Sequence, residues 1–238
     1  MLKRILQDEA YNNMPFFFEY LKKNGFSRQL IHKYVLSGWL EKIAQGVYQK
    51  PGIDFSPIAV IRALQKQLGI EIYLGAATAL SVQNVSFNLR TERNIEVFIP
   101  LNYRPTRWLK SIKQIRWFKA SLFKTTKGLH IYNDIFISTL ERAILETISL
   151  VPVNMEYEEA YHLLELLPTL RKTLLQELLQ ECHSVKTKRL FLYMAETIAH
   201  NWFSGLDLTT INLGHGDRQI VKNGVYNKKY KIIIPEVT

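Results

Sequence analysis

The stretch that decides the fold is GFSRQLIHKYVLSGWLEKIAQGVYQKPG, which runs from Gly25 to Gly52. Gly25 can adopt a positive φ without steric penalty, and Ser27 follows as a natural helix N-cap. The pattern therefore predicts a helix from Ser27 to Gly38. The residues Trp39 to Tyr48 then read as two short strands around the turn Ala44-Gln45-Gly46. A capped helix followed at once by a β-hairpin is typical of a winged helix-turn-helix.

The predicted helix has one apolar face and one polar face. At about 100° per residue, Leu30, Ile31, Tyr34 and Val35 cluster on the side that packs. The opposite side offers hydrogen-bond donors at the end of the helix that a recognition helix presents to base edges, where the helix dipole also attracts phosphate. Candidate DNA-binding residues are Ser27, Arg28, Gln29, His32 and Lys33 in the helix, with Lys42, Gln45 and Lys50 in the hairpin for sugar-phosphate contacts.

Leu36 interrupts the polar face, and we expect it to touch the wing or a thymine methyl group. The competing interpretation of the whole unit is a small helical cap with a solvated polar face. Three helices, a glycine turn, a capped third helix and an immediate hairpin favour the DNA-binding interpretation because they occur in the order that this motif requires.

The residues that precede this stretch complete the motif. Leu2, Ile5 and Leu6 recur at helical spacing, and Met14 to Leu21 predict a second helix that begins around Pro15. Acidic residues at 8 and 9 interrupt the start before a signal-peptide core can form. No apolar run approaches the length that crosses a bilayer, so we expect a soluble, cytoplasmic protein.

Charge is distributed unevenly along the chain. The 238 residues carry a net charge of +10, from 31 Lys and Arg against 21 Asp and Glu. Residues 1–52 hold eight basic and four acidic groups, residues 90–130 hold ten and two, and residues 131–183 hold three and nine. The two basic segments favour a polyanionic partner, whereas the acidic segment indicates a surface with a different role.

The rest of the chain predicts a mixed fold. A helix that begins at Pro57 and ends before Gly69 is expected to join two domains. Further predicted elements are strands at 70–74 and 95–100, short helices at 76–80 and 106–110, a helix capped by Ser138 that runs to Leu150, helices at 156–167, 168–182 and 190–202, and strands at 209–213, 219–221 and 230–235. The predicted fold class is α+β: a winged helix-turn-helix at 1–52, followed by a larger mixed α/β domain with a helical layer at 53–238.

Residues 90–130 form the second basic segment. Its basic residues recur at every third position, and a period of three matches neither a helix nor a strand. Two interpretations stay open. The residues form an auxiliary phosphate or RNA surface with stacking aromatics at 103, 108, 117 and 118, or they form a solvated rim whose aromatics belong to the core. The candidate auxiliary contacts are Arg104, Arg107, Lys110, Lys113 and Arg116.

Catalytic and metal-binding patterns are missing from the sequence. The one cysteine, Cys182, excludes an internal disulfide and a thiolate metal cage, and it is expected to be buried and inert. Gly214-His215-Gly216-Asp217 reads as a turn. The acidic residues between 70 and 136, Glu71, Glu92, Glu96 and Asp134, do not form a metal-binding signature. We expect no enzymatic activity, cofactor or metal; a nuclease-like or nucleotidyl-transferring carboxy-terminal domain and an RNA-binding module are the alternatives.

Three segments in order resemble the AbiEi family of antitoxins from type IV toxin-antitoxin systems. They are Gly25 to Gly52, LGAATAL at Leu74 to Leu80, and ISTLERAILE at Ile137 to Glu146. The resemblance implies a phage-defence antitoxin whose amino-terminal winged helix represses its own operon at inverted repeats. It also implies a carboxy-terminal domain that neutralises a nucleotidyltransferase toxin encoded beside it. Direct contact with the toxin, and binding to DNA as a monomer or a dimer, are left open.

Overall fold

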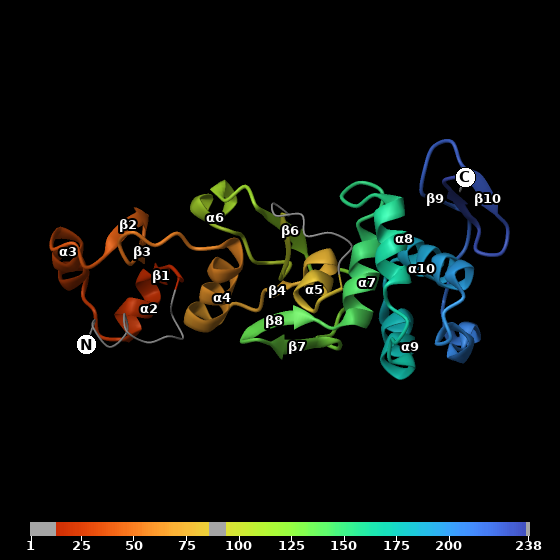
Figure 1. Ribbon diagram of the computed structural model, residues 1–238, viewed down its shortest axis with the longest axis horizontal. Coiled ribbons are helices and arrows are strands. Elements are labelled where there is room, and N and C mark those ends of the chain that lie inside the picture. Colours follow the sequence, from red (N-terminus) through yellow and green to blue (C-terminus); the bar gives the residue numbers. More distant parts are fainter. Residues whose placement is uncertain (1–12, 86–93, 237–238) are drawn as a thin grey trace.

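The computed structural model describes residues 13–85 and 94–236. The fold is α+β, as predicted, and its parts follow one another along the long axis of the molecule (Figure 1). The winged unit lies at one end, a five-stranded sheet lies in the middle, and helices and a small three-stranded sheet form the other end. The first helix predicted around Leu2 lies outside the described residues.

The winged unit contains β1 (Phe16–Phe17), α2 (Phe18–Lys23), α3 (Arg28–Leu36), β2 (Glu41–Ala44) and β3 (Val47–Gln49). Its antiparallel sheet has the order β1-β3-β2. Five side chains form its small core: Phe16, Leu21, Phe26, Ile31 and Leu40.

Two predicted boundaries in this unit are wrong. The helix expected around Pro15 begins at Phe18, because Phe16 pairs with Tyr48 and Phe17 with Val47 as a third strand. The first wing strand begins at Glu41 instead of Trp39. The amide of Trp39 donates to the carbonyl of Tyr34 at 2.9 Å, so this residue closes the end of α3.

Helix α4 (Pro57–Leu68) follows the winged unit along the chain and precedes the central sheet. Ser56 caps its start, Pro57 occupies the first helical position, and Gly69 ends it with a φ of 61°. The buried Gln67 side chain accepts from the amide of Phe17 at 3.0 Å and donates to the carbonyl of Pro15 at 2.8 Å. The same helix packs against β8, so α4 belongs to both halves of the molecule.

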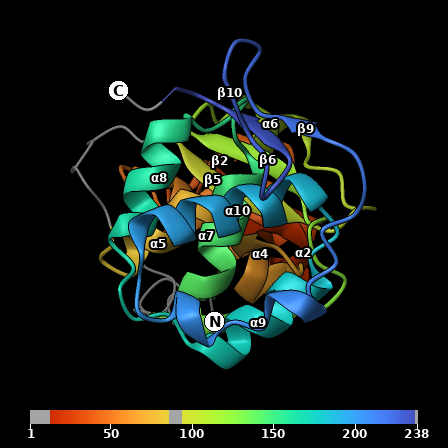
Figure 2. The same cartoon turned by 90° about the vertical axis from the view of Figure 1, so that its right-hand side faces the viewer.

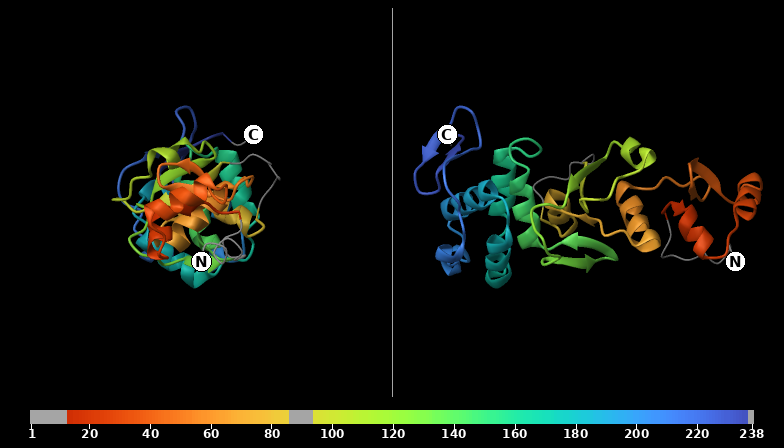
Figure 3. Two further views of the ribbon diagram at one scale, coloured as in Figure 1. Left: turned by 90° about the vertical axis from the view of Figure 1, so that its left-hand side faces the viewer. Right: turned by 180° about the vertical axis from the view of Figure 1, so that it is seen from behind.

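The central sheet is mixed and has the order β6-β5-β4-β8-β7. Its strands are β4 (Tyr73–Leu74), β5 (Ile95–Ile99), β6 (Ile115–Lys119), β7 (Leu129–Tyr132) and β8 (Ile135–Ser138). The β5-β6 and β4-β8 pairs are parallel, and the other two pairs are antiparallel. Helix α5 (Ala76–Val82) follows β4, and α6 (Arg107–Ser111) connects β5 with β6 near α4; the view from behind shows the same order (Figure 3).

A helical layer covers one end of the sheet. It comprises α7 (Leu140–Ser149), α8 (Tyr157–Glu165), α9 (Lys172–Glu181) and α10 (Val185–Ile198). Helix α7 packs against α5 and against the other three, and α10 lies in front of it when the molecule is viewed from this end (Figure 2). Ser138, predicted to cap α7, instead ends β8, and Thr139 takes the cap position. Among the described residues, no helix combines the length and apolar character needed to span a membrane.

The carboxy-terminal strands differ from those predicted at 209–213, 219–221 and 230–235. The residues expected to form a strand at 209–213 overlap a short 3-10 helix, Leu208–Thr210. Asp207 causes this turn, because its carboxylate accepts from the Thr209 amide at 3.0 Å and from the Thr209 hydroxyl at 2.6 Å. The sheet contains β9 (Arg218–Gln219), β10 (Val225–Asn227) and β11 (Ile232–Ile234) in the order β10-β11-β9, with β9 parallel to β11.

The segments at 74–80 and 137–146 meet around the fully buried carboxylate of Glu146. This group accepts from the Tyr73 hydroxyl at 2.9 Å, the Ser138 hydroxyl at 2.7 Å, the Ala76 amide at 3.2 Å and Arg142 Nε at 2.9 Å. A Cβ at Gly75 would lie 2.5 Å from Glu146 Oε2. These residues therefore hold β4, β8 and α7 together.

Candidate nucleic-acid interface

Helix α3 exposes the polar face that the sequence predicts. The Ser27 hydroxyl caps the helix by accepting from the Leu30 amide at 3.1 Å, and Ile31 is buried beneath it. The four candidate readers on the opposite face, Arg28, Gln29, His32 and Lys33, are all exposed. Packing therefore fixes the helix by one side and leaves the other side available to a partner.

The hairpin places a second set of polar groups beside α3. Gln45 and Gly46 form its turn, where Gly46 takes a φ of 72°, and a register shift separates Lys42 from Ala44. Lys42 and Gln45 are exposed, whereas Lys50 is half-buried. The wing thus presents Lys42 and Gln45 most openly among its three candidates.

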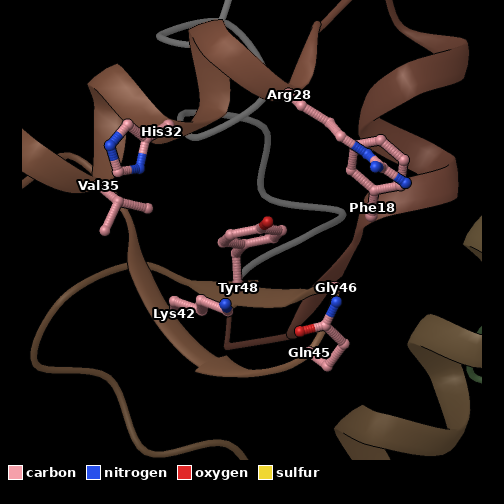
Figure 4. Close-up of a pocket in the computed structure, with 8 residues that line it drawn as sticks. All are labelled: Phe18, Arg28, His32, Val35, Lys42, Gln45, Gly46 and Tyr48. Carbon is pink, nitrogen blue, oxygen red and sulfur yellow. The ribbon is translucent and has the colours of Figure 1, made fainter.

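A hollow of about 270 Å³ separates α3 from the wing. Figure 4 shows the ring of Tyr48 between His32 and Val35 on the helix and the hairpin that carries Lys42 and Gln45. Four predicted site residues share this hollow: Arg28, His32, Lys42 and Gln45. The others, Ser27, Gln29, Lys33 and Lys50, are not among the residues that line it.

Four lining residues were not among the predicted site residues: Phe18, Val35, Gly46 and Tyr48. Phe18 lies under Arg28, whose guanidinium carbon is 5.0 Å from the ring centroid, and Tyr48 forms part of the lining. Such a cation-π contact restrains the arginine without consuming its hydrogen-bond donors. The period-two pattern of the wing strand places Tyr48 on the face opposite Val47, which was the available signal for this residue.

Leu36 is 74% exposed and does not line the hollow between α3 and the wing. Trp39, just beyond the end of α3, is 52% exposed. Both roles expected for Leu36, contact with the wing or with a thymine methyl group, stay predictions.

The basic side chains of residues 90–130, the second basic segment, fall into two groups: some are hydrogen-bonded within the protein and others are exposed. Arg116 donates to the Asn154 carbonyl at 3.2 Å and to its side-chain oxygen at 2.7 Å. The ammonium of Lys119 donates to carbonyls of the loop that follows β5. Arg104 is exposed and donates to the Leu101 carbonyl at 3.0 Å. The remaining candidates, Arg107, Lys110 and Lys113, are exposed on and after α6.

The aromatics of this segment pack within the protein. The Trp108 ring lies 6.3 Å from Phe17 and 5.9 Å from Phe55, both in edge-on geometry. The Phe118 ring lies 5.6 Å from that of Phe98. Trp108 therefore fixes α6 against the winged unit, so these rings serve packing and the basic side chains of α6 lie close to that unit.

The groups considered for catalysis have other roles. Cys182 is buried, and burial raises the pKa of its thiol to about 11. Glu96 is buried against Thr78, and Asp134 pairs with Lys66 at 3.1 Å. Glu92 lies outside the described residues. Within residues 13–85 and 94–236, no three His, Cys, Asp or Glu side chains gather as metal ligands would.

Comparisons with known proteins agree with the resemblance. The model of the AbiEi antitoxin amino-terminal domain, a transcriptional regulator, matches residues 2–91. A second model, described as a transcriptional regulator and AbiEi antitoxin of a type IV toxin-antitoxin system, matches residues 93–235. The chain belongs to the AbiEi antitoxin family. Its members are described as transcriptional regulators and antitoxins, which is a regulatory role.

This AbiEi chain also has a solved structural relative. The crystal structure of the RV2827C protein from Mycobacterium tuberculosis is similar with a TM-score of 0.68, over 97% of this chain and 90% of that one. The identity is 14%, so the likeness shows the fold alone. The search of the curated proteins found no match.

Proposed function

We propose that this AbiEi-family chain represses its own operon by binding operator DNA through α3 and the wing. The observation that carries the proposal is the exposed donor face of α3, which shares a hollow with the wing residues Lys42 and Gln45. The proposal agrees with the regulatory role of the family.

The geometry suits the major groove of B-DNA, which is about 12 Å wide and accepts an α-helix. Arg28 has the fork of donors that reads guanine, and Gln29 and His32 offer further donors to base edges. Lys33 and the wing residues Lys42, Gln45 and Lys50 supply phosphate contacts, and Leu36 faces a thymine methyl group. One short helix reads few bases, so we propose that inverted repeats take two protomers.

The basic side chains of the α6 region extend this surface. Arg104, Arg107, Lys110 and Lys113 are exposed next to the winged unit, and we assign them phosphate contacts beyond the recognition helix. Arg116 is left out of the proposed set, since its guanidinium is held by Asn154.

We propose that residues 53–238 neutralise the nucleotidyltransferase toxin. The support is the family's antitoxin role together with the exposed acids of α8 and its cap, such as Glu156 and Glu158, which offer a surface to a basic protein. Under this proposal, residues 53–238 carry the antitoxin function and α3 does not take part in it.

The test is binding to the DNA upstream of the protein's own gene at fixed salt. The double variant Arg28→Ala, Lys33→Ala should lose sequence-specific binding, whereas Lys222→Ala, Lys228→Ala should retain it. Both variants lose two positive charges from exposed positions, so an equal loss would show that net charge alone drives binding. Preference for tRNA over operator DNA would favour the RNA-binding alternative, and cleavage with Mg²⁺ would favour the nuclease alternative.

A further inference from the structure

A cavity of about 550 Å³ lies far from the winged unit, at the junction of α9 and α10. Its volume is within the range of small-molecule sites, roughly 300–1,000 Å³. Three parts of the chain form its walls: the loop at 124–125, the α9-α10 junction and the loop at 212–214. Nothing in the proposed repression or neutralisation uses this cavity.

Buried arginines hold two of these walls in place. Arg189 donates to the carbonyls of Leu213 at 2.8 Å and Gly214 at 3.0 Å. Arg142 donates to the carbonyl of Thr125 at 2.9 Å. A Cβ at Gly214 would lie 2.8 Å from Val185, so this loop lies directly on the start of α10. The cavity is therefore built by specific contacts between distant segments.

The acidic group in the wall is held by neighbouring residues. Glu181 accepts from the Thr125 hydroxyl at 2.6 Å and pairs at 2.9 Å with the Lys127 ammonium, which Glu177 shares at 3.1 Å. The amide nitrogen of Gln180 donates to the Thr210 hydroxyl at 2.9 Å. These contacts order the wall, and two lysines, Lys124 and Lys188, complete its charged lining.

Lys188 is the unusual group of the lining. Its side chain is 4% exposed, yet its ammonium makes no hydrogen bond or ion pair with any residue that the structure describes. Burial lowers the pKa of this ammonium, and the adjacent Cys182 thiol acts in the opposite direction. The stem of Lys188 is buried, but its ammonium nitrogen is not one of the described buried atoms that lack a partner, so it reaches the open space of the cavity. A bound anion would give it a charge-assisted hydrogen bond there.

Two further features favour an anion at the same place. The wall includes Val185, the first residue of α10, and a helix of 14 residues carries partial positive charge at its amino terminus. Lys124, on the opposite wall, is exposed and extends the positive lining. We propose that this cavity binds a small phosphate-bearing anion, with Lys188 and the start of α10 as its central contacts and Lys124 at its mouth.

The experiment measures binding of inorganic phosphate, AMP and ATP to the full chain at matched ionic strength, without Mg²⁺. Isothermal titration calorimetry measures each affinity directly. The buried Cys182 thiol, whose pKa is raised, is not suited as a reporter. Comparing phosphate with AMP distinguishes free phosphate from a phosphate group carried by a larger molecule. Equal affinity would show that the cavity recognises the phosphate group alone. Tighter binding of AMP would show that the cavity also contacts the rest of the ligand.

Three variants complete the test. Lys188→Met keeps the side-chain length and should weaken binding about tenfold, the value of one charge-assisted hydrogen bond. Lys124→Ala alters an exposed position that cannot disturb the core, and it should weaken binding by a smaller factor. Lys222→Met is the matched control and should bind as the unaltered chain does. No binding of any of the anions, or equal affinity in Lys188→Met, would overturn the proposal.

Discussion

Arg28 occupies the first position of α3 and lies over the ring of Phe18 at 5.0 Å. The contact limits the conformations of the guanidinium before any partner arrives, while the residue stays exposed. Lys42 lies across the hollow on a wing strand, with its side chain exposed. The Arg28 side chain is therefore restrained by a ring contact, whereas the Lys42 side chain is exposed on a wing strand. We expect their substitutions to affect DNA binding differently.

Arg28→Ala is expected to weaken operator binding by about 1 to 3 kcal/mol and to relax the preference at one base pair. Lys42→Ala is expected to weaken all DNA sequences alike, because a phosphate contact carries no base information. Footprinting of the operator and of a scrambled sequence at one salt concentration measures both effects. Unchanged affinity and specificity for Arg28→Ala would place the recognition surface elsewhere.

Glu141 connects α7 to the start of α9 through Arg171. Its carboxylate accepts from the Arg171 amide at 2.9 Å, from Nε at 3.0 Å and from Nη2 at 2.8 Å. Burial alone would raise the pKa of Glu141, but these hydrogen bonds outweigh it and hold the pKa below its ordinary value of 4.5. The folded state thus favours the ionised form.

The contribution of Glu141 is therefore present above about pH 4.5 and is lost as the pH falls through the lower pKa of the folded state. Glu141→Gln should lower the melting temperature at neutral pH and approach the unaltered protein in acid. Thermal unfolding from pH 7 to pH 3 measures this, with the exposed Glu158→Gln as the control. Melting curves that stay parallel over the whole range would contradict the assignment.

At the scale of elements, α4 couples the winged unit to the central sheet through one side chain. Gln67 binds the Phe17 amide and the Pro15 carbonyl, both in a buried region. Gln67→Leu leaves two buried backbone groups without partners, which should reduce the free energy of unfolding by about 2 kcal/mol or more. Urea denaturation measures this loss.

The control for Gln67→Leu is Gln114→Leu. Gln114 is exposed, and its side chain makes no hydrogen bond in the described part of the chain. Hydrogen exchange then locates the loss: amides of β1 and β3 should exchange faster, whereas those of α7 should not. Equal exchange in both regions would show that the winged unit and the sheet unfold as one body. The sequence alone predicts α4 well, because Ser56, Pro57 and Gly69 are local signals.

For the whole molecule, repression and neutralisation should separate. Alanine at Arg28, Gln29, His32 and Lys33 together should abolish repression and leave antitoxin activity intact when a foreign promoter drives expression. All four side chains are exposed, so their loss does not disturb the core of the winged unit. Growth on co-expression with the toxin, at antitoxin levels matched by blot, measures neutralisation. Failure to rescue would assign neutralisation to the winged helix itself.

The sequence by itself determined the parts of this protein that depend on neighbouring residues. The cap at Ser27, the two faces of α3, the turn at Gly46 and the bounds of α4 all follow from propensity and periodicity within a few positions. These are also the residues that present the proposed DNA-binding surface. Local chemistry therefore predicted a capped helix and a following hairpin before any tertiary contact was known.

Only the tertiary structure decided the features that join distant positions. Phe16 and Phe17 form a strand because β3 lies beside them, and Arg116 is occupied because Asn154 reaches it from another part of the chain. Lys188 lies in a cavity whose walls come from segments that are widely separated in sequence. No local pattern encodes such contacts, since their energy arises from packing and desolvation that exist only after the chain has folded.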